Sequence, residues 1–299
     1  MNIGKVELDM SFYDPKRDTY SDGDIEAEIL EIVKEGREKE VLYADNRWPI
    51  LYYFSRIRHN IVSWYGFQKG KTVLEIGTGC GAITGLFTQK GLKVDGVESS
   101  KRRATITAYR NKNYSDLRIF VGDFNIMEFP QKYDYITLIG VLEYARMFLP
   151  ESRDPYADML AKCKKLLKDG GKLFIAIENR LGLKYFAGAH EDHTGRVFDG
   201  IEGYPTSRKI QTFSKSELSG LLTKAGLHDA EWYYPYPDYK LPVVVYSDEF
   251  LPDGEKVAQE ITAYDSSREM YFDERKAIQK IADAKDFATF SNSFLVICH

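Results

Sequence analysis

The sequence predicts an α/β fold, in which a doubly wound parallel sheet is covered by helices on both faces. From residue 71 onward, short apolar stretches rich in β-branched residues alternate with helical patterns. This alternation is typical of a parallel sheet, because each strand needs a long return connection to reach the next. A cluster of glycines follows the first stretch, in VLEIGTGCG. Doubly wound sheets bind ligands beyond the carboxyl ends of their strands, so the residues that finish these strands are the candidate functional residues.

Helices are predicted before the sheet. Residues 24–39 carry apolar side chains at helical spacing between charged ones, which is typical of an amphipathic helix. The unusually aromatic stretch 47–67 predicts a second helical segment. We therefore expect residues 1–69 to form an N-terminal helical cap.

Seven core strands are expected. Five run along KTVLEIG, LKVDGVES, RIFVGDF, YDYITLIGVL and KLFIAIEN, and two along EWYYPYP and SFLVICH. A helix over residues 213–227 has Ser214 as its N-cap, Glu217 to complete a capping box and Gly226 as its stop. We expect the core to occupy residues 70–239 and 287–299, with a long insertion at 240–286 before the last strand.

Composition excludes some classes of partner. The 41 basic and 45 acidic residues give a net charge of −4, without the basic excess of a protein that neutralises phosphates, so nucleic acid is a poor candidate. Cys80, Cys163 and Cys298 have no disulfide or metal spacing, which indicates a reducing cytoplasm. No signal-like N-terminus and no apolar run of about eighteen residues is present, so we expect a cytoplasmic protein without membrane insertion.

The glycine loop predicts a nucleotide-like ligand. Gly77, Gly79 and Gly81 would expose backbone N–H groups where a helix begins, and such groups bind electron-rich ligands. Dinucleotides and S-adenosylmethionine both use a strand, a glycine turn and an acidic residue on the next strand. Ala82 completes the dinucleotide fingerprint, and Glu98 lies about twenty residues on, where a carboxylate accepts ribose hydroxyls. The loop alone leaves both ligands open.

Three further features favour S-adenosylmethionine. Glu75 lies inside the first core strand, where a carboxylate needs a partner such as a cationic amino group. Asp123 ends the third strand and could bind an adenine amino group, while Phe124 packs on the ring. Gly140 ends the fourth strand, where a ligand or backbone must approach closely.

The chain resembles the class I S-adenosylmethionine-dependent methyltransferases. The resemblance is carried by VLEIGTGCG, VDGVESS, VGDF, YDYITLIGVLEY and LLKDGGKLFIAIEN, and residues 211–299 fit the last helix–strand–strand unit of that family. It implies a Rossmann-like sheet of seven strands, a methyl-transfer reaction and S-adenosylmethionine as the cofactor. The insertion departs from the family pattern.

The resemblance also implies cofactor contacts at four strand ends. The loop after the first strand borders the methionine moiety, the second strand end holds the ribose, the third the adenine, and the fourth lines the sulfonium. The residues are, in that order, Glu75, Gly77, Thr78, Gly79 and Gly81; Glu98 and Ser99; Asp123 and Phe124; and Gly140 and Val141.

The acceptor of the methyl group is less specified. The fourth strand leads into IGVLEY, without the Asn-Pro-Pro-Tyr type of turn associated with amine methylation of adenine in nucleic acids. A hydroxyl acceptor must lose a proton, and histidine suits that task. We expect His193 to be the general base, oriented by Asp192 or Glu191, with His190 as a second candidate. The alternative, that these residues only hold the loop in place, stays open.

A metal is the other use of this loop. Glu191, Asp192, His193 and Asp199 could hold a magnesium ion that polarises a sugar diol. Our prediction is nevertheless a site without a metal.

The substrate class is inferred from aromatic side chains and a looser resemblance. Segments such as ENRLGLKYFAGAHEDHTG are similar to bacterial methyltransferases that accompany glycosyltransferases in cell-surface polysaccharide synthesis. We expect O-methylation of a sugar, glycan precursor or other small hydroxylated molecule. Alternatives are an N-methyltransferase of a small amine or amino sugar, a silent cofactor-binding partner of a glycosyltransferase, and a nicotinamide redox enzyme. The helices at 24–65 or the insertion could form a homodimer. The aromatic residues are Tyr185, Phe186, Phe198, Tyr233, Tyr234, Tyr236 and Tyr239.

Overall fold

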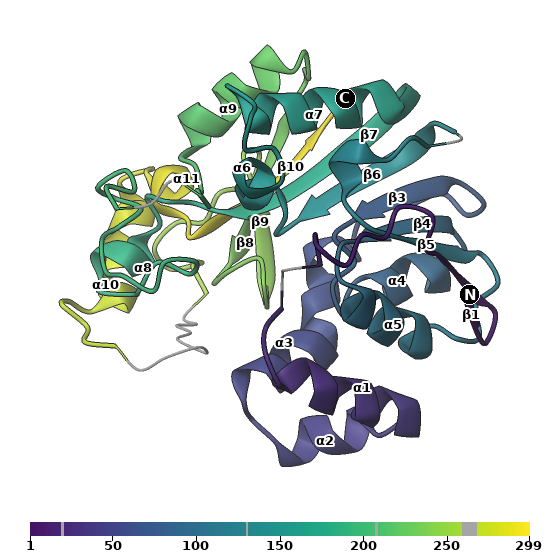
Figure 1. Cartoon of the computed structure of the whole chain (residues 1–299). Coiled ribbons are helices and arrows are strands. Elements are labelled where there is room, and N and C mark those ends of the chain that lie inside the picture. The colour runs from purple at the N-terminus through teal and green to yellow at the C-terminus, as the bar shows by residue number, and fades with distance from the viewer. Residues whose placement is uncertain (19–20, 130, 207–208, 259–267) are drawn as a thin grey trace. The chain divides into compact units, whose positions relative to one another are not determined.

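The computed structural model contains two compact units, each described here by itself. Unit 1 comprises Met1–Leu138 and Leu166–Lys172, and unit 2 comprises Ile139–Lys165 and Leu173–His299. The structure describes residues 1–18, 21–129, 131–206, 209–258 and 268–299 (Figure 1). The predicted cap, core and insertion boundaries stay a proposal about how the chain is organised.

Unit 1 contains the parallel part of the predicted sheet. The strand order is β1-β2-β5-β4-β3-β6, and every pair from β2 to β6 is parallel. Parallel pairing brings the carboxyl ends of these strands to one edge, where the glycine loop and Glu98 lie. The strands are β1 (Asn2–Ile3), β2 (Val6–Asp9), β3 (Thr72–Ile76), β4 (Lys93–Glu98), β5 (Leu117–Val121) and β6 (Tyr133–Ile139), whose last residue belongs to unit 2.

Helices of unit 1 pack on this sheet and on one another. Ile29, Ile32 and Val33 of α1 form an apolar cluster with α3 and with Ile106 of α5, and Figure 1 shows α4 and α5 beside strands β3 to β5. The amphipathic face predicted for residues 24–39 is thus confirmed as buried. The helices are α1 (Ile25–Glu35), α2 (Glu38–Ala44), α3 (Trp48–Phe54), α4 (Thr84–Gln89) and α5 (Lys101–Arg110), with short 3-10 turns η1 (Arg56–Ile61) and η2 (Phe124–Ile126).

The sheet has more strands than the expected seven, and two of the additional strands lie in the region expected as a helical cap. The described residues contain ten strands, of which the seven predicted ones are β3 to β8 and β10. The additional strands are β1 and β2 in the expected cap, and β9 (Val244–Ser247) in the expected insertion. Val6 and Leu8 are buried while Glu7 between them is exposed, so β2 has the alternation of a half-buried strand, extended by its pairing with β5.

Unit 2 is built on antiparallel strands. The order is β7-β10-β8-β9, and β10 runs antiparallel to both β7 and β8. The register pairs Ser293 with Glu178, the last residue of β7 (Leu167–Glu178). The other strands are β8 (Glu231–Tyr236) and β10 (Ser293–Cys298), and the helices are η3 (Leu142–Tyr144), α6 (Ala145–Phe148), α7 (Pro155–Leu166, ending in unit 1), α8 (Leu183–Phe186), α9 (Lys215–Lys224), α10 (Glu274–Asp283) and α11 (Phe287–Phe290). None of the described helices is long and apolar enough to cross a membrane.

The capping box predicted for α9 is confirmed. The Ser214 hydroxyl accepts a hydrogen bond from the Glu217 backbone N–H, and the Glu217 carboxylate accepts one from the Ser214 backbone N–H at 2.8 Å. Gly226 follows the helix with φ +72°, the left-handed conformation that glycine adopts readily.

Replacing Ser214 with Ala should destabilise unit 2 by about 1 kcal/mol, because an N-terminal N–H loses its partner. Urea unfolding of the two proteins measures this change. Ser219→Ala, within the same helix, is the matched control and should change the free energy of unfolding by less than about 0.5 kcal/mol. Equal effects of the two substitutions would contradict a specific role of the cap.

Candidate active site

The glycine loop of unit 1 has the backbone that its sequence predicts. Gly77, Gly79 and Gly81 have φ of 76°, 54° and 75°, a region in which other residues are strained. The N–H groups of Gly77 and Thr78 both donate to the carbonyl of Val97 in β4, at 2.9 and 3.0 Å. The loop is therefore fixed to the neighbouring strand before any ligand binds.

Glu98 stabilises the same loop from the end of β4. Its Oε2 accepts the Gly79 N–H at 2.8 Å, and its Oε1 accepts the N–H of Ser100 at 2.9 Å and the hydroxyl of Ser99 at 3.3 Å. Glu98 is 4% exposed. The structure thus places this predicted ribose-binding carboxylate directly at the glycine loop.

Asp123 and Phe124, the predicted adenine-binding pair, follow β5. Asp123 caps η2 by accepting the Asn125 N–H at 2.9 Å, and its other oxygen lies 3.0 Å from the guanidinium of Arg17. Phe124 is buried, and its ring is tilted by 40° against that of Phe129, with ring centroids 5.8 Å apart. Sequence reasoning did not identify Arg17 as a neighbour of this site.

Glu75 fits a cationic ligand. Its Oε2 is buried and has no hydrogen-bond partner among the described residues. Burial raises the pKa of Glu75 to about 8, although the charge of Arg58 opposes the shift. A buried carboxyl without a partner is costly unless a ligand satisfies it. The residues present therefore fit S-adenosylmethionine, whose amino group and sulfonium are cationic; Glu75 and the glycine loop would hold the methionine moiety, and Glu98 the ribose.

Gly140 and Val141, predicted at the sulfonium end, begin unit 2. Gly140 has φ +68°, and its N–H donates to the Ala176 carbonyl of β7 at 2.9 Å. A Cβ atom on Gly140 would lie 2.7 Å from the Tyr239 hydroxyl and 3.6 Å from Glu143 Oε1. Glycine suits this turn, because a positive φ strains other residues and a Cβ would approach the Tyr239 hydroxyl to 2.7 Å.

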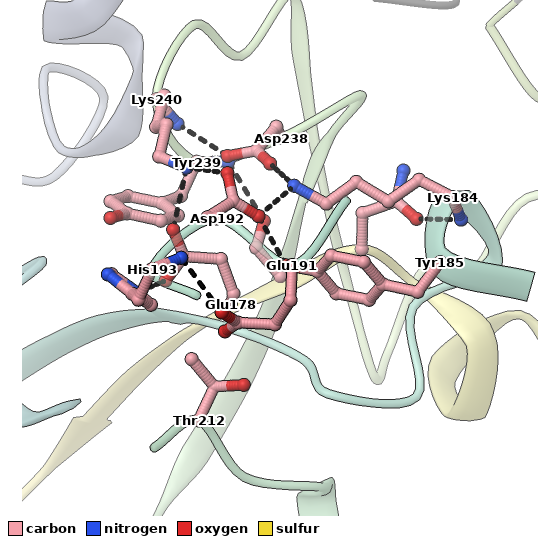
Figure 2. Close-up of polar contacts among 12 residues, drawn as sticks. Glu178, Lys184, Tyr185, Glu191, Asp192, His193, Thr212, Asp238, Tyr239 and Lys240 are labelled. Carbon is pink, nitrogen blue, oxygen red and sulfur yellow. Dashed lines mark hydrogen bonds and ion pairs between the residues drawn. The ribbon is translucent and has the colours of Figure 1, made fainter. Parts of the chain in front are cut away.

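His193 lies against the end of β7. Its Nε2 is 3.7 Å from Glu178 Oε2 (Figure 2). Its Nδ1 is hydrogen-bonded to the Tyr144 hydroxyl at 3.2 Å. The imidazole is 9% exposed and Glu178 is fully buried. The predicted base is therefore flanked by a carboxylate, but by Glu178 rather than by Asp192.

Asp192 faces two lysines instead. Its carboxylate contacts Lys240 and the Tyr185 hydroxyl and lies 2.9 Å from Lys184 Nζ. Lys184 also pairs with Asp238 at 2.9 Å, and Lys240 lies 2.7 Å from Glu178 Oε1. Figure 2 shows these residues as one connected network. The Asp192 carboxylate thus contacts Lys240, which in turn contacts Glu178 beside His193.

The other residues predicted on this loop, Glu191, His190 and Asp199, each make different contacts. Glu191 accepts the backbone N–H groups of His193 and Thr194 at 2.8 and 2.7 Å, so it fixes the loop on which His193 lies. His190 makes a backbone bridge with Val197, and Asp199 is buried near Thr206. The four-residue magnesium set therefore does not assemble, since Glu191 and Asp192 are already engaged by N–H groups and lysines.

Charged groups of both signs face one another in this cluster. Burial raises the pKa of Glu143 to about 8, and the negative charge of Glu178 adds to the shift. Burial would lower the pKa of His193, but the adjacent Glu178 and Glu143 raise it to about 9. Lys240 and His193 hold the pKa of Glu178 well below its usual range, against the effect of burial. With Glu143 neutral, the carboxylates of Glu178, Asp192 and Asp238 face the cations His193, Lys184 and Lys240.

Spacing alone would also allow a metal at one point of the cluster. Ligand atoms of Glu143, Glu178 and His193 lie within 4.8 Å of one another. Lys240, at 2.7 Å from Glu178, already supplies the positive charge that a cation would bring. The expectation of a site without a metal stays a prediction.

Comparison with known proteins shows the family to which the chain belongs. The chain matches a family model described as a methyltransferase domain over residues 50–231. The chain belongs to this methyltransferase family. The match confirms the predicted S-adenosylmethionine-dependent methyltransferase domain, and with it the enzyme class and the cofactor.

Relatives cover only part of the chain. A ubiquinone biosynthesis O-methyltransferase of Pseudomonas paraeruginosa is 26% identical over 139 residues, 46% of this chain and 56% of that protein. The enzyme of the same name from Idiomarina loihiensis is 30% identical over 166 residues, 54% of this chain and 63% of that protein. The chain thus spans less than two thirds of the length of these relatives. A solved S-adenosylmethionine-dependent methyltransferase of Archaeoglobus fulgidus is 14% identical, with 91% of this chain and 98% of that one covered and a TM-score of 0.49.

Sequence reasoning missed four residues of the charged cluster around His193 in unit 2. Glu178 ends an expected strand, and that position at the sheet edge was a usable signal. Glu143 follows Gly140 in a motif that was already noted. Lys184 and Lys240 gave no signal, because only the packing of unit 2 brings them to Asp192.

Replacing Glu98 with Ala should weaken S-adenosylmethionine binding at least about tenfold, because the ribose loses its acceptor and Gly79 loses its support. Calorimetric titration measures the dissociation constant. Glu128→Ala, an exposed carboxylate just beyond η2, is the control and should leave the constant unchanged. Equal affinity of the Glu98 variant and the original protein would remove Glu98 from the cofactor site.

Proposed function

We propose that this methyltransferase transfers the methyl group of S-adenosylmethionine to a hydroxyl oxygen of a small hydroxylated molecule, with sugars and glycan precursors as the leading class. The observation that carries the proposal is a buried imidazole, His193, whose Nε2 has no hydrogen-bond partner among the described residues and lies beside Glu178. Oxygen methylation requires removal of a proton, and this arrangement suits that step.

The residues of unit 2 would handle the acceptor proton in a defined order. The hydrogen bond between the Tyr144 hydroxyl and Nδ1 fixes the orientation of the His193 ring, with Nε2 toward Glu178. Because the neighbouring carboxylates raise the pKa of His193 to about 9, the ring must first release a proton to water. The acceptor hydroxyl then transfers its proton to the neutral ring, and Glu178 stabilises the imidazolium that forms again. When bound, S-adenosylmethionine supplies an electrophilic methyl group. Burial of the cluster excludes water from the reacting oxygen.

Support for the acceptor class comes from two sources. Both curated relatives reported above are named O-methyltransferases. Phe198 and Tyr271 stack with ring centroids 5.9 Å apart, and Tyr271 is 56% exposed, so together they offer a flat apolar surface of the kind that sugars contact. Tyr185, Tyr234, Tyr236 and Tyr239 are buried and are core residues, which narrows the aromatic surface that the sequence suggested.

The test of this proposal is formation of S-adenosylhomocysteine and a methylated product with a panel of nucleotide sugars, glycans, phenols and small amines. Mass spectrometry of the product identifies the methylated atom. O-methylation supports the proposal, whereas exclusive N-methylation contradicts it.

A cytoplasmic location, a possible homodimer and the exclusion of nucleic acid as acceptor belong to the same proposal.

Replacing His193 with Gln should lower the turnover number at least about a hundredfold at saturating substrate, because the hydroxyl loses its proton acceptor. Binding of S-adenosylmethionine should change less than about twofold, because the proposed cofactor contacts are retained. His228→Gln, an exposed histidine of unit 2, is the matched control. An unchanged turnover number in the His193 variant would exclude it as the base.

A further inference from the structure

Glu143 is a buried acid that the proposed proton transfer leaves unused. It lies in η3, is 1% exposed, and its Oε2 has no hydrogen-bond partner among the residues that the structure describes. Buried polar atoms nearly always have a partner, so an unpartnered one needs an explanation. A ligand that satisfies Glu143 is the simplest explanation, because this carboxyl lies inside a site.

The position of Glu143 connects the two ends of the proposed reaction. Its Oε1 lies 3.6 Å from the point where a Cβ on Gly140 would stand, at the turn proposed for the sulfonium end. Its carboxyl also lies within 4.8 Å of ligand atoms of Glu178 and His193. A molecule held by His193 is therefore within hydrogen-bond reach of Glu143 as well.

The charges around Glu143 favour its neutral form. Glu178, at the end of β7, is the nearby negative group, whereas His193 on the loop and Lys240 after β8 are the positive ones. Lys240 lies against Glu178, at 2.7 Å from Oε1, and His193 lies on the other oxygen. Glu143 thus shares a buried site with a carboxylate that has taken the available cations, and a proton is its best remaining partner. A protonated carboxyl has an O–H group to donate.

We propose that Glu143 is a second acceptor-binding residue, a neutral carboxyl that donates a hydrogen bond to an oxygen adjacent to the hydroxyl that His193 deprotonates. This inference rests on the proposed function. It narrows the substrate class to molecules with two neighbouring oxygens, such as sugar diols or ring diols. A molecule with a single isolated oxygen would leave one of the two groups unsatisfied.

Two substitutions separate a neutral donor from an ionised carboxylate. Glu143→Gln keeps a neutral donor of the same shape, and Glu143→Leu removes it. We expect the first variant to lose less than about tenfold in kcat/KM and the second at least about a hundredfold, because an unmatched buried donor is lost from the transition state. Glu151→Leu, at an exposed position, controls for an added apolar residue.

Two further measurements test the role of Glu143 independently: the pH dependence of kcat/KM, and a comparison of two acceptors that differ by one oxygen. Glu143 loses its proton as the pH rises, so kcat/KM should fall at high pH in the original enzyme and should not fall in Glu143→Gln. The second readout compares an acceptor that has two adjacent hydroxyls with the same molecule lacking the neighbouring oxygen. In the original enzyme, kcat/KM should be at least about tenfold lower for the molecule that lacks this oxygen. In Glu143→Leu, kcat/KM should differ little between the two acceptors. Infrared difference spectra should also show the band of a protonated carboxyl, absent from Glu143→Gln.

Several outcomes would overturn the inference. Absence of the protonated-carboxyl band at neutral pH would show that Glu143 is ionised. Equal losses of kcat/KM in Glu143→Gln and Glu143→Leu would show that Glu143 acts as an ionised carboxylate. If a chelator also abolished the activity of the original enzyme, Glu143 would be a metal ligand. Unchanged activity of Glu143→Leu would make the residue structural. Failure of the proposed function itself is seen separately, as a product methylated on an atom other than oxygen.

Discussion

Glu178 is the constraint on which unit 2 depends. Its side chain is fully buried at the end of β7, where a lone carboxylate would be too costly to keep charged. Lys240 and His193 flank it, and Asp192 then positions Lys240. Placement of this one carboxylate therefore determines where the histidine loop and the segment after β8 must fold. The same carboxylate raises the pKa of His193. The charge pairing that lets Glu178 remain buried therefore also changes the proton affinity of the histidine.

In unit 1, Glu98 is a buried carboxylate comparable to Glu178, but its partners are backbone N–H groups and not lysines. Glu98 accepts hydrogen bonds from the N–H groups of Gly79 and Ser100 and so holds the glycine loop in shape. The N–H groups of Gly77, Thr78 and Gly81 donate to backbone carbonyls, so the loop does not expose them as the sequence predicted. Glu75 is the contrasting case, because its Oε2 has no hydrogen bond in the part of the chain that the structure describes. A preformed loop beside an unsatisfied acid is a suitable site for a cationic nucleoside.

Sequence periodicity was enough to predict the seven central strands and the cap of α9, because each depends on local pattern. It did not predict β9, which is defined by pairing with β8, or β1 and β2, which were included in the expected helical region. For the site, strand ends located the glycine loop, Glu98 and His193. Lys184 and Lys240 lie 56 positions apart, and their meeting at Asp192 depends on tertiary packing rather than on any repeat in the sequence.

The central claim is that buried carboxylates make His193 an unusually strong base. Nuclear magnetic resonance of ¹⁵N-labelled histidine, with His193→Gln to assign the signal, follows its protonation directly in the free enzyme. The account predicts a pKa near 9, lowered when Glu178 is replaced with Gln, because Glu178 stabilises the charged ring. A pKa at the ordinary value of about 6.5, unaffected by that substitution, would contradict it.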